Sequence, residues 1–273
     1  MNDRVELSIA DGVAHVKLVR SDKMNALDSA MFSAITEVGE KLANDSSVRV
    51  VVLSGEGRAF CAGLDMSSFS AMADSPADGE RSADSGSKKL LATRIHGITN
   101  SPQHVAWLWR ELPVPVIAAV HGVSFGGGFQ VALGADMRYA APGTRFSVME
   151  IKWGLVPDMA GTQLMRHLVR DDVARELTYS GRIFDADEAL QLGLITRICE
   201  DPLAAALETA QQIANRNPDA IRAAKRLLNE ANVISPAEGL LMESVEQDDI
   251  IGTPNQIEAV MAEMQKRSPN FTG

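Results

Sequence analysis

Two short glycine-bearing segments, each directly after an apolar run, constrain this chain more than any other feature of its sequence. The run Val48–Leu53 precedes Gly57–Asp65 (GRAFCAGLD), and Val114–Val120 precedes His121–Gln130 (HGVSFGGGFQ). Short β-branched runs of this kind predict buried strands. Backbone at glycine can approach a ligand closely, because glycine has no side chain. Two such turns at neighbouring strand ends could aim two peptide N–H groups at one oxygen atom, which is the construction of an oxyanion hole.

The remaining patterns predict an α/β fold. Alternating residues with a turn at Asp11-Gly12 indicate a hairpin over Val5–Val19, and an i, i+4, i+7, i+11 stripe from Met31 to Leu42 indicates a helix. Further along the chain, we expect a serine-rich loop over 67–89, then helix over Leu90–Leu112. From Gly161 onward the pattern is mostly helical. We therefore expect an α/β core over residues 1–200 and a helical region over 201–273, in which Pro218, Pro236 and Pro254 begin helices.

Charge and composition set the first limits on function. The chain has 273 residues and a formal net charge of −10, whereas a nucleic-acid binder needs a basic face. No apolar run is long enough to span a membrane, and the first residues lack the apolar segment of a signal peptide. Cys61 and Cys199 lie far apart and indicate reduced thiols. We expect a cytoplasmic protein that binds neither nucleic acid nor membrane.

Several familiar motifs are missing from the sequence. None of the five histidines stands four residues from another, and there is no HExxH, so the spacing predicts no zinc site. There is no phosphate-binding G-x-x-x-x-G-K-[ST] segment, and the glycine triplet lacks the spacing of a dinucleotide fingerprint. The sequence therefore predicts no metal and no bound cofactor.

A serine hydrolase is one alternative. Gly122–Gly126 fits G-x-S-x-G between a predicted strand and a predicted helix, which is the setting of a nucleophilic serine. Ser124 would be the nucleophile, and Asp158 and His167 follow in the chain order expected of such a triad.

The two glycine-bearing segments, taken together, resemble the signature segments of the crotonase (enoyl-CoA hydratase/isomerase) superfamily. Three further stretches resemble motifs of the same superfamily, and the likeness spans nearly the whole chain apart from residues 67–110. These stretches are Arg20–Leu27 (RSDKMNAL), Phe146–Thr162 (FSVMEIKWGLVPDMAGT) and Arg182–Leu194.

The resemblance implies a spiral of ββα units whose C-terminal helical region, 201–273, forms a homotrimer or a dimer of trimers. It also implies an acyl-CoA thioester substrate, with no cofactor other than the coenzyme A that the substrate carries. Matching by motif, the oxyanion amides fall on Ala62 and Gly127. The remaining residues that the resemblance places at the substrate are Arg20, Lys23, Ala26, Gly63, Leu64, Asp65, Gly126, Gln130 and Lys266.

The sequence departs from the superfamily at a position that matters for the reaction. Hydratases add water with two carboxylates, and matching by motif these fall on Gln130 and Glu150. Glutamine only forms hydrogen bonds, so one carboxylate remains. A single carboxylate suffices to move a double bond, and Asp158 stands where the dienoyl-CoA isomerase branch also has an aspartate. We therefore expect an enoyl-CoA isomerase, with Glu150 as the catalytic base and Asp158 assisting. A hydratase and a non-catalytic acyl-CoA binder remain alternatives.

Overall fold

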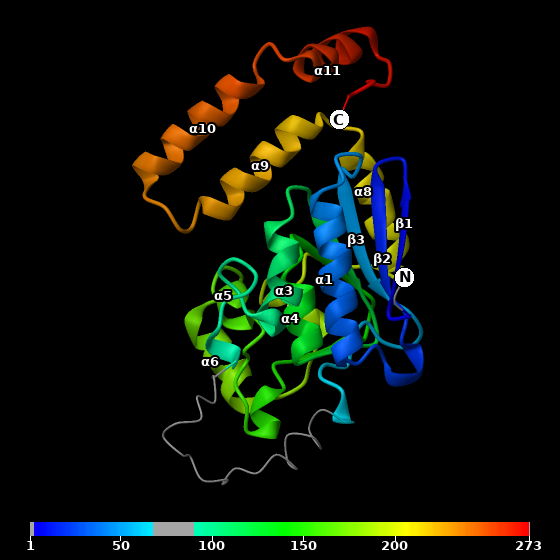
Figure 1. Cartoon of the computed structure of the whole chain (residues 1–273), viewed down its shortest axis with the longest axis vertical. Coiled ribbons are helices and arrows are strands. Elements are labelled where there is room, and N and C mark those ends of the chain that lie inside the picture. Colours follow the sequence, from blue (N-terminus) through cyan, green and yellow to red (C-terminus); the bar gives the residue numbers. More distant parts are fainter. Residues whose placement is uncertain (1–2, 68–89, 273) are drawn as a thin grey trace.

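A computed structural model of the chain describes residues 3–67 and 90–272 (Figure 1). Within these residues, six strands form the main sheet in the order β1-β2-β3-β4-β6-β9. The first pair is the predicted hairpin and is antiparallel, and every later pair is parallel. The strands are β1 (Val5–Ala10), β2 (Val13–Leu18), β3 (Val50–Gly55), β4 (Val116–Val120), β6 (Met137–Ala140) and β9 (Arg197–Ile198).

Helices cover both faces of this sheet (Figure 1). Successive side chains of a strand point to opposite faces, so Val50 and Val52 of β3 pack toward α8 (Pro202–Ala214). Their neighbours Val51 and Leu53 belong to the larger core on the other face. That core includes side chains of α1 (Ser29–Ala43), α3 (Ser101–Glu111) and α4 (Gly127–Leu133).

A small second sheet supports the glycine triplet. It consists of β5 (Val123–Phe125), β7 (Arg145–Ser147) and β8 (Phe184–Asp185). Its strands are too short to give a periodic sequence pattern, so this sheet could not be predicted from the sequence. The rings of Phe129, Phe146 and Phe184 pack with centroids 5.6 to 5.8 Å apart, which ties α4 to this sheet.

The prediction of a helix over Leu90–Leu112 is wrong for the first half of this range. A short 3-10 turn, η2 (Leu90–Ala92), is followed by loop, and α3 begins only at Ser101. Asn100 caps α3 by accepting a hydrogen bond from Gln103, and Gly97 has a positive φ of 57°. Both features favour a helix start over helix continuation. The predicted loop over 67–89 lies outside the described residues, apart from Ser67.

Shorter elements lie in the connections between these strands and helices. They are η1 (Ser21–Lys23), η3 (Glu150–Trp153), α5 (Gly161–Met165), α6 (Asp171–Ser180) and α7 (Ala186–Gln191).

The last three helices extend beyond the body of the molecule (Figure 1). They are α9 (Pro218–Glu230), α10 (Pro236–Ile250) and α11 (Pro254–Gln265), and each begins at its predicted proline. Lys225 anchors α9: its buried ammonium donates to the carbonyls of Trp109 and Val114 and pairs with Asp136 at 2.9 Å. By contrast, α10 has no buried residue. None of the helices that the described residues form is long and apolar enough to cross a membrane.

Candidate active site

The two glycine-bearing segments run side by side at the carboxyl ends of β3 and β4. The Phe60 N–H donates to the His121 carbonyl at 2.9 Å, and Cys61 exchanges backbone hydrogen bonds with Val123 and Phe125. Gly63 then passes directly over the second segment. A Cβ atom on Gly63 would lie 2.7 Å from the Phe125 carbonyl oxygen and 3.6 Å from the Gly127 nitrogen. The two turns therefore lie in contact, as the sequence predicted.

Two backbone N–H groups at this meeting point are available to a ligand. Gly127 is the first residue of α4, where an N–H has no partner within the helix, and it has no acceptor among the described residues. In the other segment, Leu27 donates to the Gly63 carbonyl at 2.8 Å and accepts from the Asp65 N–H at 3.0 Å. These bonds bracket Leu64, whose own N–H is left without an acceptor in the described part of the chain.

The Ala62 amide, which we predicted as an oxyanion donor, is already occupied. Its N–H donates to the Met24 carbonyl at 2.9 Å. This contact between Ala62 and the Arg20–Leu27 segment joins residues far apart in the sequence, and a motif match could not detect it. Leu64, two residues later, has an N–H with no acceptor among the described residues.

Arg20 and Asp65 hold the first segment in place. Arg20 pairs with Asp65 at 2.5 Å and donates to the Ala26 carbonyl at 3.0 Å. Hydrogen bonds from Ser67 and the nearby Arg20 guanidinium lower the pKa of Asp65 to about 2. The side chains of Arg20 and Asp65 are thus engaged with each other, while Lys23 is exposed and makes no ion pair with any described residue.

A missed residue, Asn25, completes this support. Its buried amide donates to the carbonyls of Glu56, Ala59 and Phe60, and its oxygen accepts from the Arg20 N–H. Asn25 also has a positive φ of 54°, a conformation that asparagine tolerates better than most residues. Its place in the MNAL stretch was the only sequence signal.

Glu150 lies beside the glycine triplet with one carboxylate oxygen free. Its side chain is buried, at 8% exposure, and its Oε2 has no hydrogen-bond partner among the described residues. A Cβ on Gly126 would lie 3.2 Å from its Oε1, which places the carboxyl next to the turn that carries Gly127. Burial raises the pKa of Glu150, the charge of Asp158 raises it further, and the hydrogen bond from Gln130 opposes the shift.

Gln130 determines which carboxylate oxygen is free. Its Oε1 accepts from the backbone N–H groups of Met159 at 2.9 Å and Gly161 at 2.7 Å. These two donors fix the orientation of the amide, so its Nε2 must point the other way. There it donates to Glu150 Oε1 at 2.6 Å, which leaves Oε2 as the uncommitted oxygen.

Asp158 is exposed and does not cap the following helix. The N-cap of α5 is Ala160, with no side-chain hydrogen bond, so the carboxyl of Asp158 serves no capping role. Desolvation by the surrounding chain raises the pKa of Asp158, and its charge acts on Glu150. A buried carboxyl and an exposed carboxyl thus interact at one site.

Ser124 lacks the surroundings of a nucleophile. Its Oγ is fully buried and has no hydrogen-bond partner within the described residues. His167, the base that the alternative required, instead accepts from the Arg166 guanidinium at 3.1 Å. An activated serine needs a base within hydrogen-bond reach, so this geometry does not support the hydrolase.

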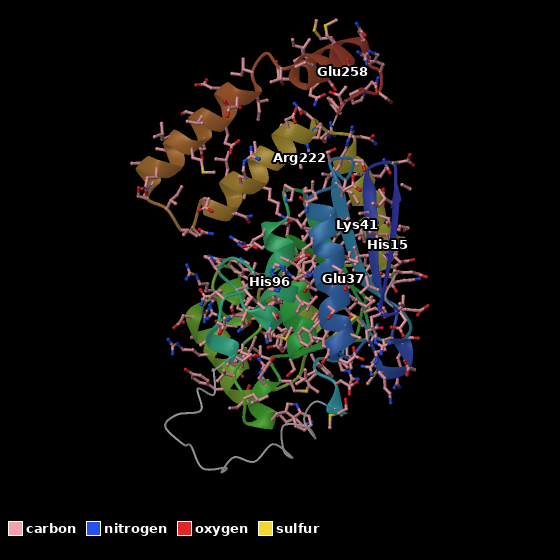
Figure 2. All side chains as sticks on the ribbon, viewed as in Figure 1. His15, Glu37, Lys41, His96, Arg222 and Glu258 are labelled. Carbon is pink, nitrogen blue, oxygen red and sulfur yellow. The ribbon has the colours of Figure 1, made fainter. Side chains whose placement is uncertain are left out.

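Lys266 lies far from these groups within one chain. It follows α11, which Figure 1 shows at the top of the view, away from α4 in the body, and Figure 2 shows Glu258 of the same helix there. Its neighbour Arg267 is occupied by Glu258 at 2.5 Å. The structure therefore does not bring Lys266 together with the other candidate residues of its own chain.

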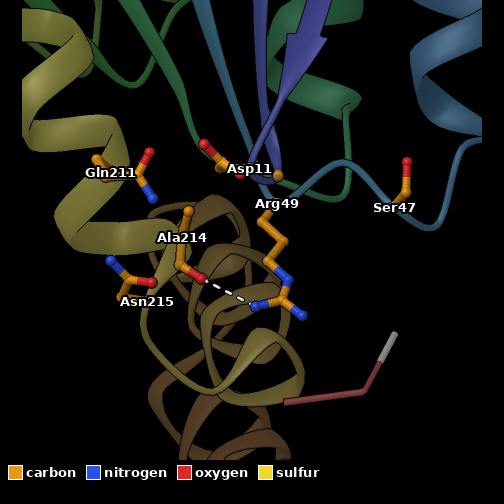
Figure 3. A pocket seen from close by; sticks show the side chains of 7 residues that line it. Asp11, Ser47, Arg49, Gln211, Ala214 and Asn215 are labelled. Atoms are coloured by element: carbon orange, nitrogen blue, oxygen red, sulfur yellow. Dashed lines mark hydrogen bonds between the residues drawn. The ribbon is translucent and has the colours of Figure 1, made fainter. Parts of the chain in front are cut away.

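A hollow lies at the other end of the sheet (Figure 3). It is formed by the β1–β2 turn, Arg49 and the end of α8. Arg49 donates to the carbonyls of Ala214 and Phe271 at 3.1 and 2.9 Å, so its guanidinium ties down the C-terminal tail. Ligands of α/β sheets bind at the carboxyl ends of strands, which is where the glycine segments lie.

Comparisons with known proteins show the family to which the chain belongs. The family model described as enoyl-CoA hydratase/isomerase matches residues 8–273. The probable enoyl-CoA hydratase 2, mitochondrial, of Arabidopsis thaliana is 31% identical over 96% of this chain and 82% of that protein. The mitochondrial Delta(3,5)-Delta(2,4)-dienoyl-CoA isomerase of Mus musculus is 31% identical over 93% of this chain and 77% of that protein. The crystal structure of an enoyl-CoA hydratase from Bacillus anthracis superposes with a TM-score of 0.85 at 27% identity, covering 99% of both chains.

The chain therefore belongs to the enoyl-CoA hydratase/isomerase family and has the crotonase fold. It is an enzyme of the enoyl-CoA hydratase/isomerase type. The resemblance read from the sequence is confirmed at this level, and the relatives include both hydratases and an isomerase.

Proposed function

We propose that this enzyme moves a carbon–carbon double bond in an enoyl-CoA, with the buried carboxylate of Glu150 as its acid–base group. The observation that carries the proposal is the pair formed by Gln130 and Glu150. A neutral amide stands where a two-carboxylate hydratase would need its second acid. A raised pKa suits a group that must both take up and release a proton near neutral pH.

The proposed reaction needs only this carboxylate and two peptide hydrogens. Glu150 Oε2 takes a proton from the carbon beside the thioester carbonyl, and the C–H electrons form an enolate whose charge rests on the thioester oxygen. The N–H groups of Gly127 and Leu64 donate to that oxygen. Glu150 then returns the proton to the far carbon of the original double bond, which shifts the double bond toward the thioester. Each such N–H donor contributes about 2.7–4 kcal/mol, so no additional cofactor is required.

Hydration is the second candidate, because Asp158 interacts electrostatically with Glu150. In that reaction one carboxyl activates water and the other delivers a proton. The exposed Asp158 would have to supply the second carboxyl, alone or through a held water. A non-catalytic acyl-CoA binder is the remaining alternative.

The substitution Glu150→Gln tests the isomerase proposal. It keeps the shape of the side chain and its hydrogen bond from Gln130, but it removes the base. We expect isomerisation of 3-enoyl-CoA to fall by about 10²–10⁴-fold, while the Kd for a saturated acyl-CoA stays unchanged. Products are identified by mass and NMR in deuterated water, where isomerisation, hydration and hydrolysis differ. Glu37→Gln, on the outer face of α1 (Figure 2), is the control.

Two outcomes would contradict the isomerase proposal. Turnover retained by Glu150→Gln would remove this residue from the mechanism, and hydration as the main wild-type reaction would favour the second candidate. Acyl-CoA binding with no turnover across chain lengths and double-bond positions would indicate the non-catalytic binder.

We also propose that the active enzyme is a homotrimer or a dimer of trimers built through residues 201–273 and located in the cytoplasm. Exposed apolar side chains on α10 support the assembly. Lys266 would then reach the coenzyme A phosphates of a neighbouring chain, since it lies far from the site of its own. The exposed Lys23 would contact the adenine end of the substrate.

A further inference from the structure

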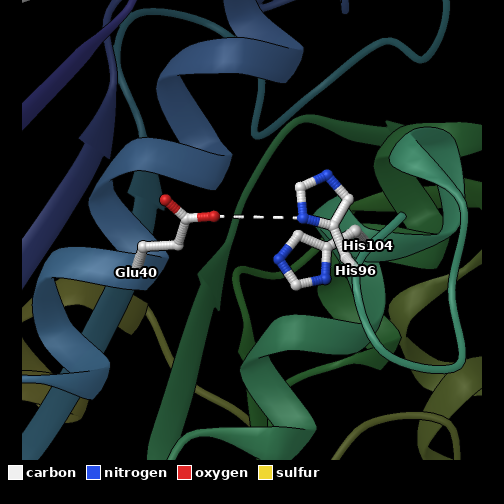
Figure 4. A group of neighbouring side chains, drawn as sticks. All are labelled: Glu40, His96 and His104. Atoms are coloured by element: carbon white, nitrogen blue, oxygen red, sulfur yellow. Dashed lines mark ion pairs between the residues drawn. The ribbon is translucent and has the colours of Figure 1, made fainter.

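Two histidines and a glutamate meet on the surface formed by α1, α3 and the loop before α3 (Figure 4). Glu40 comes from α1, His96 from the loop and His104 from the second turn of α3. One nitrogen of each ring and one Glu40 carboxylate oxygen all lie within 4.8 Å of one another. The three residues are separated along the chain, so histidine spacing could not predict their meeting.

The hydrogen bonds around His104 assign its free nitrogen. The Thr99 hydroxyl donates to the His96 carbonyl at 2.7 Å, so it can only accept from His104 Nδ1, 3.3 Å away. His104 therefore carries its proton on Nδ1 and has a lone pair on Nε2. Metal-binding histidines are usually oriented by such a bond from the second ring nitrogen.

The other two groups present atoms to the same space. His96 Nδ1 lies 3.9 Å from Glu40 Oε1, and Figure 4 shows both rings turning a nitrogen toward the carboxylate. The backbone of the loop is held by reciprocal hydrogen bonds between His96 and Thr99, at 3.2 and 2.9 Å.

We infer that Glu40, His96 and His104 form a binding site for a divalent transition-metal ion such as Zn²⁺. Imidazole nitrogens and a carboxylate oxygen suit this class of ion, and water would complete the coordination. In the structure the two imidazole rings stack, with centroids 4.2 Å apart and planes 6° from parallel. Binding requires them to tilt until both nitrogens lie about 2.0–2.1 Å from the ion. Glu40 is 61% exposed and His96 is 24% exposed, so these two side chains have room to adjust.

A bound ion would join α1 to the loop that precedes α3. None of the three residues belongs to the glycine segments or to the Glu150 turn, so we expect occupancy of this site to stabilise the fold without supplying a reacting group. Because such an ion binds only the folded chain, the melting temperature should rise with Zn²⁺ concentration.

Calorimetric titration of the untagged full chain with Zn²⁺, after removal of metals with a chelator, tests this inference. We expect one Zn²⁺ per chain, with binding lost in His96→Ala and His104→Ala and weakened at least ~10-fold in Glu40→Gln. Thr99→Val should weaken binding by about 10–100-fold, because it removes the bond that orients His104. With Co²⁺ as a second probe, the visible absorption of a low-coordinate site should appear in the wild type and disappear in His104→Ala.

His167→Ala is the matched control, since His167 is a surface histidine outside the cluster. Far-ultraviolet circular dichroism confirms that each variant is folded. The inference is overturned if the wild type does not bind Zn²⁺, or if His104→Ala binds it as tightly as the wild type. It is also overturned if His167→Ala loses as much binding as the cluster variants, because the ion would then be held by scattered surface histidines.

Discussion

The side chain of Gln130 determines which carboxylate oxygen of Glu150 is free. Two backbone N–H groups hold its oxygen, so its amide nitrogen faces Glu150 and engages one carboxylate oxygen. The same hydrogen bond counteracts part of the rise in the pKa of Glu150 that burial causes. In the proposed mechanism Gln130 is therefore a positioning residue, because its hydrogen bond selects the free oxygen of Glu150 and favours the ionised carboxylate.

The pH dependence of catalysis tests this role of Gln130. A base works only when deprotonated, so kcat/KM falls as the pH drops through the pKa of Glu150. Gln130→Ala removes the hydrogen bond that lowers this pKa, so we expect the acidic limb of the kcat/KM profile to move to higher pH. We also expect kcat to fall by about 10-fold or more, because the base is less well positioned. Steady-state kinetics across pH measure both effects.

Gln163→Ala, an exposed glutamine on α5, is the control for this substitution. An acidic limb that stays in place in Gln130→Ala would show that Gln130 does not act on the Glu150 carboxyl.

At the residue scale, the sequence predicts which residues surround the site but not which backbone N–H groups are free. Glu150, Gln130 and Gly127 were predicted as site residues from motifs, and the structure places them side by side. The N–H predicted as a donor at Ala62, by contrast, is hydrogen-bonded to the Met24 carbonyl. A motif shows which residues are present, but the use of each N–H depends on the partner that tertiary contacts bring to it. The same reason explains why Asn25 was missed.

At the scale of elements, the glycine turns bring two strand ends close enough to share a ligand. Gly63 has a φ of 92° and passes against the Phe125 carbonyl, so it combines an unusual backbone conformation with a close approach. A side chain there would push apart the segments that carry the free amides. The strands that lead into these turns were predicted, because buried runs are local patterns, while the small sheet β5-β7-β8 was not.

Alanine substitutions at two glycines distinguish the effect of backbone strain from the effect of a steric clash with a neighbouring segment. Gly143 also has a positive φ, of 71°, but a Cβ there would meet nothing within 4 Å. We expect Gly63→Ala and Gly143→Ala both to lose about 1–3 kcal/mol of unfolding free energy, owing to strain. Only Gly63→Ala should also lose about 10²-fold in kcat/KM, since the donors are displaced. Denaturant unfolding and kinetics measure the two effects, and equal activity losses would contradict the proposed role of Gly63.

On the scale of the whole molecule, the C-terminal helices are incompletely packed. The side chains of Leu240, Leu241 and Val245 on α10 are each more than half exposed. By contrast, α9 is held to the body by the ion pair between Lys225 and Asp136. An apolar surface of this kind marks an interaction site. The helical character and proline starts of this region follow from local sequence signals, whereas its projection from the body is visible only in the structure (Figure 1).

Leu241→Glu tests whether α10 mediates assembly. If the enzyme is the proposed trimer, the wild type should sediment at about three times the chain mass of 29.3 kDa, or at six times this mass for a dimer of trimers. A charge in the apolar contact should shift the variant toward the monomer. Ile9→Glu, an exposed position on β1, is the control. A variant that sediments like the wild type would show that α10 is not the contact surface.

The amino-acid sequence by itself determined the main strands, most of the helices and the family, because apolar periodicity, proline and glycine positions and contiguous motifs are local properties of the chain. Tertiary structure alone decided which amides are free, which oxygen of Glu150 is uncommitted and which histidines meet at Glu40. Each of these depends on hydrogen bonds or contacts between segments distant in the sequence. These hydrogen bonds and contacts form only when the layers pack together, so no local sequence pattern predicts them.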